Sequence, residues 1–462
     1  MSSSSLLAPR FLLALSAASL VGLLAAACAS AEVEIVPSTT EPPAEPPPPP
    51  LSDGTKGPGC TGLACKVPSC TGGATTTIEG DVYDPAGKVK LYGAIVYVPN
   101  KEVAPFTKGV SCERCGTVSG EPIVSALTDE KGHFVLKDVP AGEEIPLVIQ
   151  IGKWRRQLKL PKVTACEANR VPDGEAHLPR SSVEGDIPQM AVVTGGFDEL
   201  GCLLARIGIE GAEYTPPGGK GRIHVYRGVG GGGTTTGTAP PATDLWNSVE
   251  SLSKYDAVLL ACEGWEYDEN DGTRGNKTVA AKEAMHEYAA RGGRVFATHY
   301  HYTWFKESPA DDFRGVATWN EPSSAYGTRT YEVDTSFPKG AAFAKWLEGA
   351  GATTPTGGLL VTNPGSNVSG VNPATTQRWL HTSSPANVGY FSFNTPVGAK
   401  PEAQCGRAVF SDVHVSGEQG SIALPAACGA AKLTPQELAL EFMLFDLASC
   451  IQPDNEAPKP PR

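Results

Sequence analysis

Two pairs of residues in this sequence have the types and the spacing of metal ligands. His299 and His301 follow the apolar run RVFAT, and Asp412 and His414 follow a later run, GRAVF. Residues two apart share a face wherever a strand continues. Imidazole and carboxylate groups together suit zinc or another divalent ion. These four residues are therefore a candidate metal site. Interior histidines that hydrogen-bond to the backbone are the alternative.

Cys262 offers a different chemistry. It lies in ACEGW, directly after an apolar run, and Gly264 two residues later is typical of a sharp turn. A thiol acts as a nucleophile only when a base close by generates the thiolate. His299 follows a run that could form the neighbouring strand, so Cys262 and His299 are a candidate catalytic pair. The alternative, which we favour, is a disulfide, with Cys202 as one partner, or an inert buried thiol.

Aromatic residues surround these positions. Trp265 and Tyr267 begin the acidic segment WEYDENDGTRGN, and Trp304 lies just after the two histidines. Aromatic side chains on loops at the edge of a rigid scaffold suit contacts with sugars or peptides. Together with His299 and His301, they are candidate ligand-binding residues.

From residue 186 onward, apolar runs of strand length alternate with segments of helical spacing. This alternation predicts a parallel sheet with helices on its faces, and the carboxyl ends of its strands along one edge. Cys262 and His299 are expected at that edge, where doubly wound folds have their sites. A loop-rich insertion is expected at about 306–376. Near the end of the chain, Thr434, Pro435 and Glu437 predict a capped helix.

This alternating region is similar to the flavodoxin-like, class I glutamine amidotransferase-like superfamily, and most like its trehalose-utilisation-type branch. The resemblance covers about 187–450. Catalytic members have a cysteine at the elbow between strand and helix. Here Thr298-His299-Tyr300 occupies that elbow, so the resemblance implies that the nucleophile is absent. The segments that carry the resemblance are YDAVLL (255–260), ARGG (290–293), ATHYH (297–301) and CGRAVFSDVHV (405–415).

Residues 59–180 have a different pattern, with short alternating runs separated by turn residues, which predicts a small antiparallel β-sandwich. The stretch 75–161 resembles the carboxypeptidase regulatory-like family, which has a transthyretin-like, or prealbumin-like, fold. The resemblance implies a non-catalytic accessory or adhesive module. It is carried by GDV (80–82), GAIV (93–96), TDEKGHF (128–134) and PAG (140–142).

The first residues have the pattern of an export signal. Arg10 precedes a run of apolar and small residues that ends at Cys28. This predicts a signal peptide over 1–27 and resembles the lipobox of bacterial lipoproteins, in which Cys28 becomes lipidated. The Pro-rich stretch that follows, to residue 58, predicts an extended linker, and 452–462 is a short Pro-rich tail. Most of the twelve cysteines are expected in disulfides, because an exported chain can oxidise them.

The formal net charge of −12 argues against a nucleic-acid partner, which would need a basic face. We expect a lipoprotein of the bacterial cell envelope, in the outer membrane or facing the periplasm, that binds a glycan or a protein or acts as a scaffold, rather than an enzyme. The alternatives are a hydrolase that uses Cys262 with His299, and a metal-dependent hydrolase that uses His299, His301 and His414. No cofactor is expected other than the divalent ion of the metal alternative.

Overall fold

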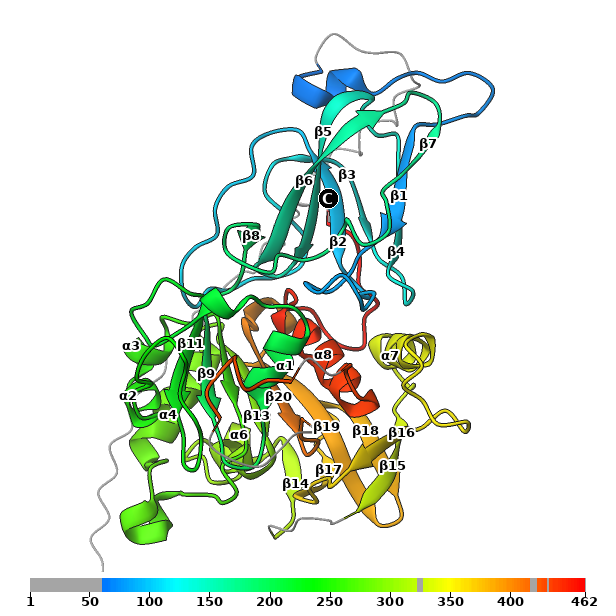
Figure 1. Ribbon diagram of the computed structural model, residues 1–462. Coiled ribbons are helices and arrows are strands. Elements are labelled where there is room, and N and C mark those ends of the chain that lie inside the picture. The colour runs from blue at the N-terminus through cyan, green and yellow to red at the C-terminus, as the bar shows by residue number, and fades with distance from the viewer. Residues whose placement is uncertain (1–59, 322–326, 416–421, 430–431, 462) are drawn as a thin grey trace, which may run out of the picture. The chain divides into compact units, whose positions relative to one another are not determined.

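The structure is a computed structural model that describes residues 60–321, 327–415, 422–429 and 432–461 (Figure 1). The predicted signal peptide (1–27), Cys28 with its predicted lipid and the whole linker to residue 58 lie outside the described residues. Within the described chain, the protein is multidomain and rich in β-sheet. No helix in this part of the chain combines the length and apolarity needed to cross a membrane.

The first region contains a five-stranded and a three-stranded sheet. The order is β3-β2-β5-β6-β8 in one and β4-β1-β7 in the other. All strand pairs in this region are antiparallel except β1 with β7. Ile78 and Phe134 from one sheet and Val96 and Leu147 from the other share one buried cluster. The strands are β1 (Thr77–Asp81), β2 (Ile95–Pro99), β3 (Pro122–Leu127), β4 (His133–Lys137), β5 (Gly142–Ile151), β6 (Trp154–Val163), β7 (Ala168–Arg170) and β8 (Gly185–Asp186).

The second region is built on a ten-stranded mixed sheet of order β10-β11-β9-β12-β13-β20-β19-β18-β15-β16. The strands from β10 to β20 are parallel, and those beyond β20 are antiparallel. Counted along the chain, β11-β9-β12-β13-β20 have the order 2-1-3-4-5, which doubly wound flavodoxin-like sheets share. The strands are β9 (Met190–Thr194), β10 (Tyr214–Thr215), β11 (Ile223–Arg227), β12 (Ala257–Leu260), β13 (Arg294–Thr298), β15 (Thr328–Val333), β16 (Leu359–Thr362), β18 (Thr376–Ser383), β19 (Ala386–Thr395) and β20 (Gly406–Ser411).

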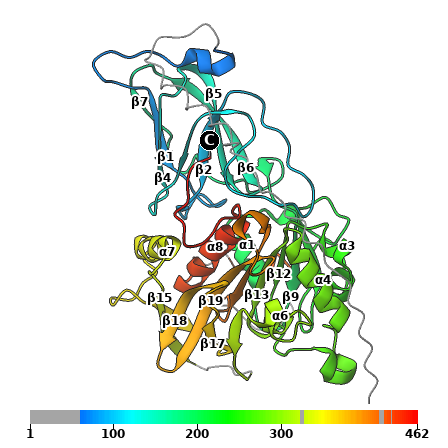
Figure 2. The same cartoon turned by 180° about the vertical axis from the view of Figure 1, so that it is seen from behind.

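Helices cover both faces of this sheet (Figure 1 and Figure 2). Successive residues of a strand point to opposite faces. Val192 therefore packs with α1 (Leu200–Arg206) and α8 (Pro435–Ala448), and Val193 packs with the helices of the other face. Those helices are α2 (Thr243–Trp246), α3 (Val249–Leu252) and α4 (Val279–Ala290).

The stretch 306–376, expected to be rich in loops, contains regular elements. Strands β15 and β16 extend the main sheet, and β14 (Ala317–Trp319) pairs with β17 (Val368–Val371). Helix α6 (Asp311–Arg314) and helix α7 (Pro338–Gly349) accompany them, and α5 (Thr303–Lys306) lies just before. The sequence did not reveal these elements, because the many Gly, Pro, Ser and Thr residues in the stretch are typical of loops and masked the short strands.

Helix α8 begins as predicted. The Thr434 side chain accepts a hydrogen bond from the N–H of Glu437, and the Glu437 carboxylate accepts one from the N–H of Thr434. The helix is buried on most sides, not along one stripe, because the first region packs against it. Trp154 contacts Phe445 edge-on at 5.8 Å, and Tyr92 stacks on Phe442 at 6.0 Å between ring centroids.

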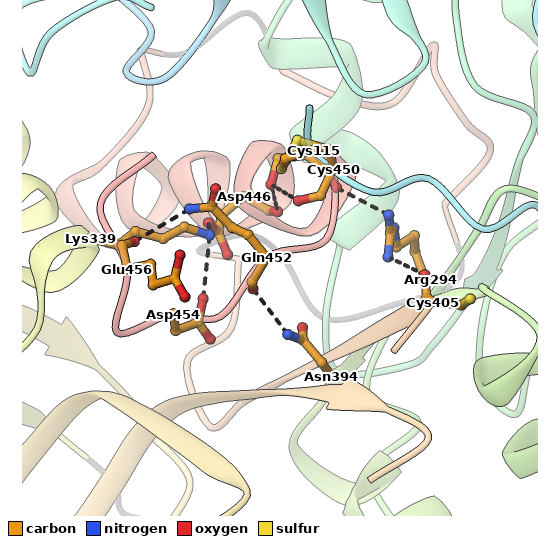
Figure 3. Close-up of a disulfide and its surroundings, with 11 residues drawn as sticks. Cys115, Arg294, Lys339, Asn394, Cys405, Asp446, Cys450, Gln452, Asp454 and Glu456 are labelled. Carbon is orange, nitrogen blue, oxygen red and sulfur yellow. Dashed lines mark hydrogen bonds and ion pairs between the residues drawn. A yellow bond between two sulfur atoms is a disulfide. The ribbon is translucent and has the colours of Figure 1, made fainter. Parts of the chain in front are cut away.

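Disulfides confirm the expectation of oxidised cysteines. Two of them join the segment between β2 and β3 to residues much later in the chain, and Figure 3 shows one of these, Cys115–Cys450. Cys202 pairs with Cys428 and not with Cys262, which is the free thiol of the described chain. The five bonds are Cys60–Cys65, Cys70–Cys166, Cys112–Cys405, Cys115–Cys450 and Cys202–Cys428.

Candidate functional site

Three neighbouring parallel strands bring one cysteine and two histidines together. Strands β12, β13 and β20 are adjacent, and Cys262, His299 and His414 follow their carboxyl ends by one to three residues. One ligand atom from each residue lies within 4.8 Å of the others. We call these three residues the rim cluster. It occupies the edge at which the sequence predicted a site.

The backbone at the end of β13 directs His299 toward the cysteine. His299 has a φ of 46°, a left-handed conformation that is uncommon for residues other than glycine. Its Nδ1 lies 3.4 Å from Sγ of Cys262, and the N–H of Gly264 donates to the same sulfur at 3.4 Å. The ring centroids of His299 and His414 are 4.7 Å apart. The elbow therefore holds a histidine, and the sulfur comes from the preceding strand.

Burial determines the charge state of two members of the rim cluster. It raises the pKa of the Cys262 thiol to about 12, although backbone N–H groups of Tyr300 and Gly264 act in the opposite direction. It lowers the pKa of His414 to about 4. The thiol is consequently protonated and the His414 imidazole is neutral at neutral pH. A protonated thiol is a poor nucleophile.

Two buried carboxyl groups lie beside the rim cluster. Oδ2 of Asp412 accepts the N–H of Asn367 at 2.8 Å, whereas its Oδ1 has no hydrogen-bond partner among the described residues. Asp198 accepts the N–H of Val415 at 3.0 Å. Burial raises the pKa of each of these carboxyl groups to about 7. The site is therefore rich in polar groups that have been removed from water.

The segment 363–367 covers the rim cluster. The N–H of Gly365 donates to the backbone carbonyl of Asp412 at 2.7 Å, and the Asn387 side chain donates to the Gly365 carbonyl at 3.2 Å. A Cβ at Gly365 would lie 2.7 Å from Cδ2 of His299 and closer still to Oδ1 of Asp412. Only glycine fits so close an approach to His299, which is buried, as is Cys262.

His301 does not join the other candidate metal ligands. The strand expected to continue through it ends at Thr298, and residues His299–Tyr302 form a 3₁₀ turn. Both ring nitrogens of His301 are engaged, because Nε2 lies 2.9 Å from the Ala261 carbonyl and Nδ1 accepts the indole N–H of Trp304 at 3.0 Å. The turn thus replaces the shared face that the spacing predicted with an interior hydrogen-bonded histidine. Asp412 is near His299 but is not part of the rim cluster.

The candidate ligand-binding aromatic residues differ in exposure. Trp304 is buried and packs on Trp246 at 5.0 Å, so it belongs to the core. Tyr267 is partly buried, with the Lys277 ammonium 5.4 Å from its ring centroid. Trp265 is 47% exposed and lies 6.0 Å from the Tyr300 ring.

Sequence reasoning missed Phe197 and Asp198, which precede α1. Phe197 is 49% exposed, and its N–H donates to the carbonyl of Cys262 at 3.1 Å. The signal was present in GGFDE, which follows the first strand of the parallel sheet, where sites of doubly wound folds form. Phe197 and Trp265 are exposed aromatic side chains beside the rim cluster, and we call them the aromatic pair.

No known family model matches this sequence, and no curated protein matches it. Among solved structures, a ThuA-like protein from Bacteroides uniformis is 9% identical, covers 55% of this chain and 89% of its own, and has a TM-score of 0.27. A cytoplasmic protein from Salmonella typhimurium is 10% identical over 56% of this chain and 98% of its own, with a TM-score of 0.31. A type II cohesin–X-dockerin complex from Acetivibrio cellulolyticus is 24% identical over 21% of this chain and 51% of that chain, with a TM-score of 0.13. Likenesses this weak carry no argument about activity or partners.

Proposed function

We propose that this protein is an exported lipoprotein of the bacterial cell envelope, anchored through Cys28, that binds a glycan or protein ligand without catalysis. A prealbumin-like module at 59–180 would precede an amidotransferase-like domain of trehalose-utilisation type at 186–451, followed by the tail 452–462. The observation that carries the absence of catalysis is the state of Cys262, a buried thiol whose pKa is about 12. The elbow position itself is occupied by His299.

The disulfides support export. Ten of the eleven described cysteines are paired, and two of the bonds close separations of 293 and 335 residues. Disulfides persist in oxidising compartments outside the cytoplasm. An export signal followed by a lipidated cysteine agrees with this chemistry, and the Pro-rich linker would hold the folded part away from the membrane.

The aromatic pair supports binding at the edge of the sheet. Trp265 and Phe197 expose large apolar surfaces, and a hydrogen bond from the Trp265 indole to Asp271 at 3.0 Å orients the ring. Exposed aromatic rings with polar neighbours suit the apolar faces of sugars, and such rings contribute much of the binding energy at interfaces.

We expect a glycan array of envelope polysaccharide fragments to show binding that depends on the aromatic pair. Replacing Trp265 and Phe197 together with alanine should weaken binding by roughly tenfold or more, because each large ring typically contributes over 1 kcal/mol. Val183→Ala is the control, since Val183 is 93% exposed and lies in the other region. Equal binding by the double variant and the control would contradict the proposed site, and a protein ligand would then be sought.

One observation favours a second candidate function. The contact of 3.4 Å between Sγ of Cys262 and Nδ1 of His299 is the geometry that a cysteine hydrolase would need between nucleophile and base. Against it stand the burial of both groups and the cover provided by Gly365. The reactivity of the thiol separates the two functions.

A further inference from the structure

We propose that the rim cluster of Cys262, His299 and His414 binds one transition-metal ion of the Zn²⁺ type. This site differs from the metal site that residue spacing predicted, because a cysteine takes the place of His301 and Asp412. The proposal does not depend on the identity of the protein's glycan or protein ligand.

The spacing of the ligand atoms fits such an ion. With a Zn–S bond of about 2.3 Å, a Zn–N bond of about 2.0–2.1 Å and a tetrahedral angle, sulfur and nitrogen lie about 3.6 Å apart. The observed separation between Sγ of Cys262 and Nδ1 of His299 is 3.4 Å. All three ligand atoms lie within 4.8 Å of one another. Ligand atoms of one tetrahedral Zn²⁺ lie about 3.3–3.6 Å apart, so the wider separations in the cluster would shorten by up to about 1.5 Å on binding.

His414 is oriented as metal-binding histidines usually are. Its ring has a hydrogen bond with the backbone of Asn363, while its Nε2 is buried and has no hydrogen-bond partner within the described residues. In metal sites the second ring nitrogen typically donates to a backbone carbonyl or carboxylate, which fixes the tautomer and directs the first nitrogen to the ion. A buried, unpartnered imidazole nitrogen beside a thiol and a second imidazole therefore indicates a ligand.

The surroundings favour a cation. Oδ1 of Asp412 is buried without a partner among the described residues and lies next to the His299 ring. The N–H of Gly264 donates to the sulfur of Cys262, an interaction that also stabilises a metal-bound thiolate. On binding, the sulfur would form a bond to the ion and its proton would pass to solvent.

The ligand set selects the class of ion. One sulfur and two imidazole nitrogens suit Zn²⁺, Co²⁺ or copper, whereas Ca²⁺ and Mg²⁺ prefer oxygen ligands. Three protein ligands leave one coordination position for a non-protein ligand, as in many zinc sites. Because segment 363–367 covers the cluster, that position would lie within the protein.

The test is a Co²⁺ titration of the purified full chain, without a histidine tag and after treatment with a chelator. We expect one Co²⁺ per chain, a thiolate-to-cobalt charge-transfer band in the near ultraviolet, and loss of that band when Zn²⁺ is added. Cys262→Ala should abolish the band. Cys262→Ala and His414→Ala should each weaken binding by at least about 100-fold, because changes in second-shell partners alone cost 10–100-fold.

His286→Ala is the matched control, because His286 is not part of the rim cluster and its Nε2 lies 3.0 Å from Oδ1 of Asp312. This variant should bind Co²⁺ as tightly as the unmodified chain does. Near-ultraviolet circular dichroism identifies any variant that fails to fold. If Cys262→Ala does not fold, Cys262→Ser is measured in its place. Three results would each overturn the proposal: binding well below one ion per chain, binding without the thiolate band, or binding by the Cys262 and His414 variants that is as tight as that of the unmodified chain. Glycan binding by the chelator-treated protein is measured separately, so failure of the metal site does not decide the proposed function.

Discussion

Replacing Arg407 with methionine is expected to lower the free energy of unfolding by about 3–5 kcal/mol, because two buried carboxylates then share a single cation, Lys339. Arg407 is 2% exposed, and its guanidinium donates to Asp446 at 2.7 Å and Asp454 at 2.9 Å. Lys339 donates to the same two carboxylates (Figure 3). Burial alone would raise the pKa of Asp446, but Arg407 and Lys339 outweigh it and lower that pKa.

Guanidinium chloride unfolding followed by tryptophan fluorescence measures this loss. Arg291→Met is the control, since Arg291 pairs with Glu287 on the surface and exposed pairs contribute about 0–1 kcal/mol. Arg407→Met combined with Asp454→Asn should recover part of the loss, because one unpaired charge is removed. Equal stability of Arg407→Met and Arg291→Met would show that the ion network does not hold the tail residue Asp454 against β20.

Replacing Glu441 with glutamine is expected to stabilise the protein, and increasingly so as the pH rises. Glu441 lies on α8, is fully buried, and neither of its carboxyl oxygens has a hydrogen-bond partner among the described residues. Burial raises its pKa well above the ordinary value, and the nearby Asp84 adds to the shift. The folded chain therefore keeps a proton that the unfolded chain loses, so the stability of the unmodified protein falls as the pH rises from about 4.5 toward the folded pKa.

The measurement compares the two unfolding free energies at about pH 5 and about pH 8. The advantage of Glu441→Gln should grow with pH, with a slope approaching about 1.4 kcal/mol per pH unit within the window. Glu348→Gln, at an exposed position of α7, should show no such growth. A constant difference between Glu441→Gln and the unmodified protein would mean that Glu441 is ionised in the folded state.

Much of the fold follows from local patterns. The strands and helices between residues 186 and 300 were predictable because buried parallel strands are short apolar runs and the helices between them have helical spacing. The cap of α8 was predictable from three residues, Thr434, Pro435 and Glu437. The all-round burial of α8 was not, because contacts with the first region depend on residues such as Trp154 that lie far away in sequence.

The candidate site was predictable in place but not in composition. The edge of the sheet followed from the direction of parallel strands. The partners of His299 did not, because a turn after Thr298 separates His299 from His301, and His299 itself has a positive φ that the sequence does not reveal. The cover at Gly365 lies in a stretch whose composition indicated loops. Elsewhere in the chain, the pairing of the ten disulfide-bonded cysteines could not be deduced from their spacing.

Alkylation of the native thiol tests the central claim most directly, which is that Cys262 is buried and protonated and does not attack substrates. The folded full chain, treated with a chelator, is exposed to iodoacetamide at about pH 7.5, and intact mass is compared before and after unfolding without reductant. We predict no adduct on Cys262 in the folded protein and one adduct after unfolding. Rapid, stoichiometric modification of Cys262 in the folded protein would show a reactive thiolate and would contradict the account.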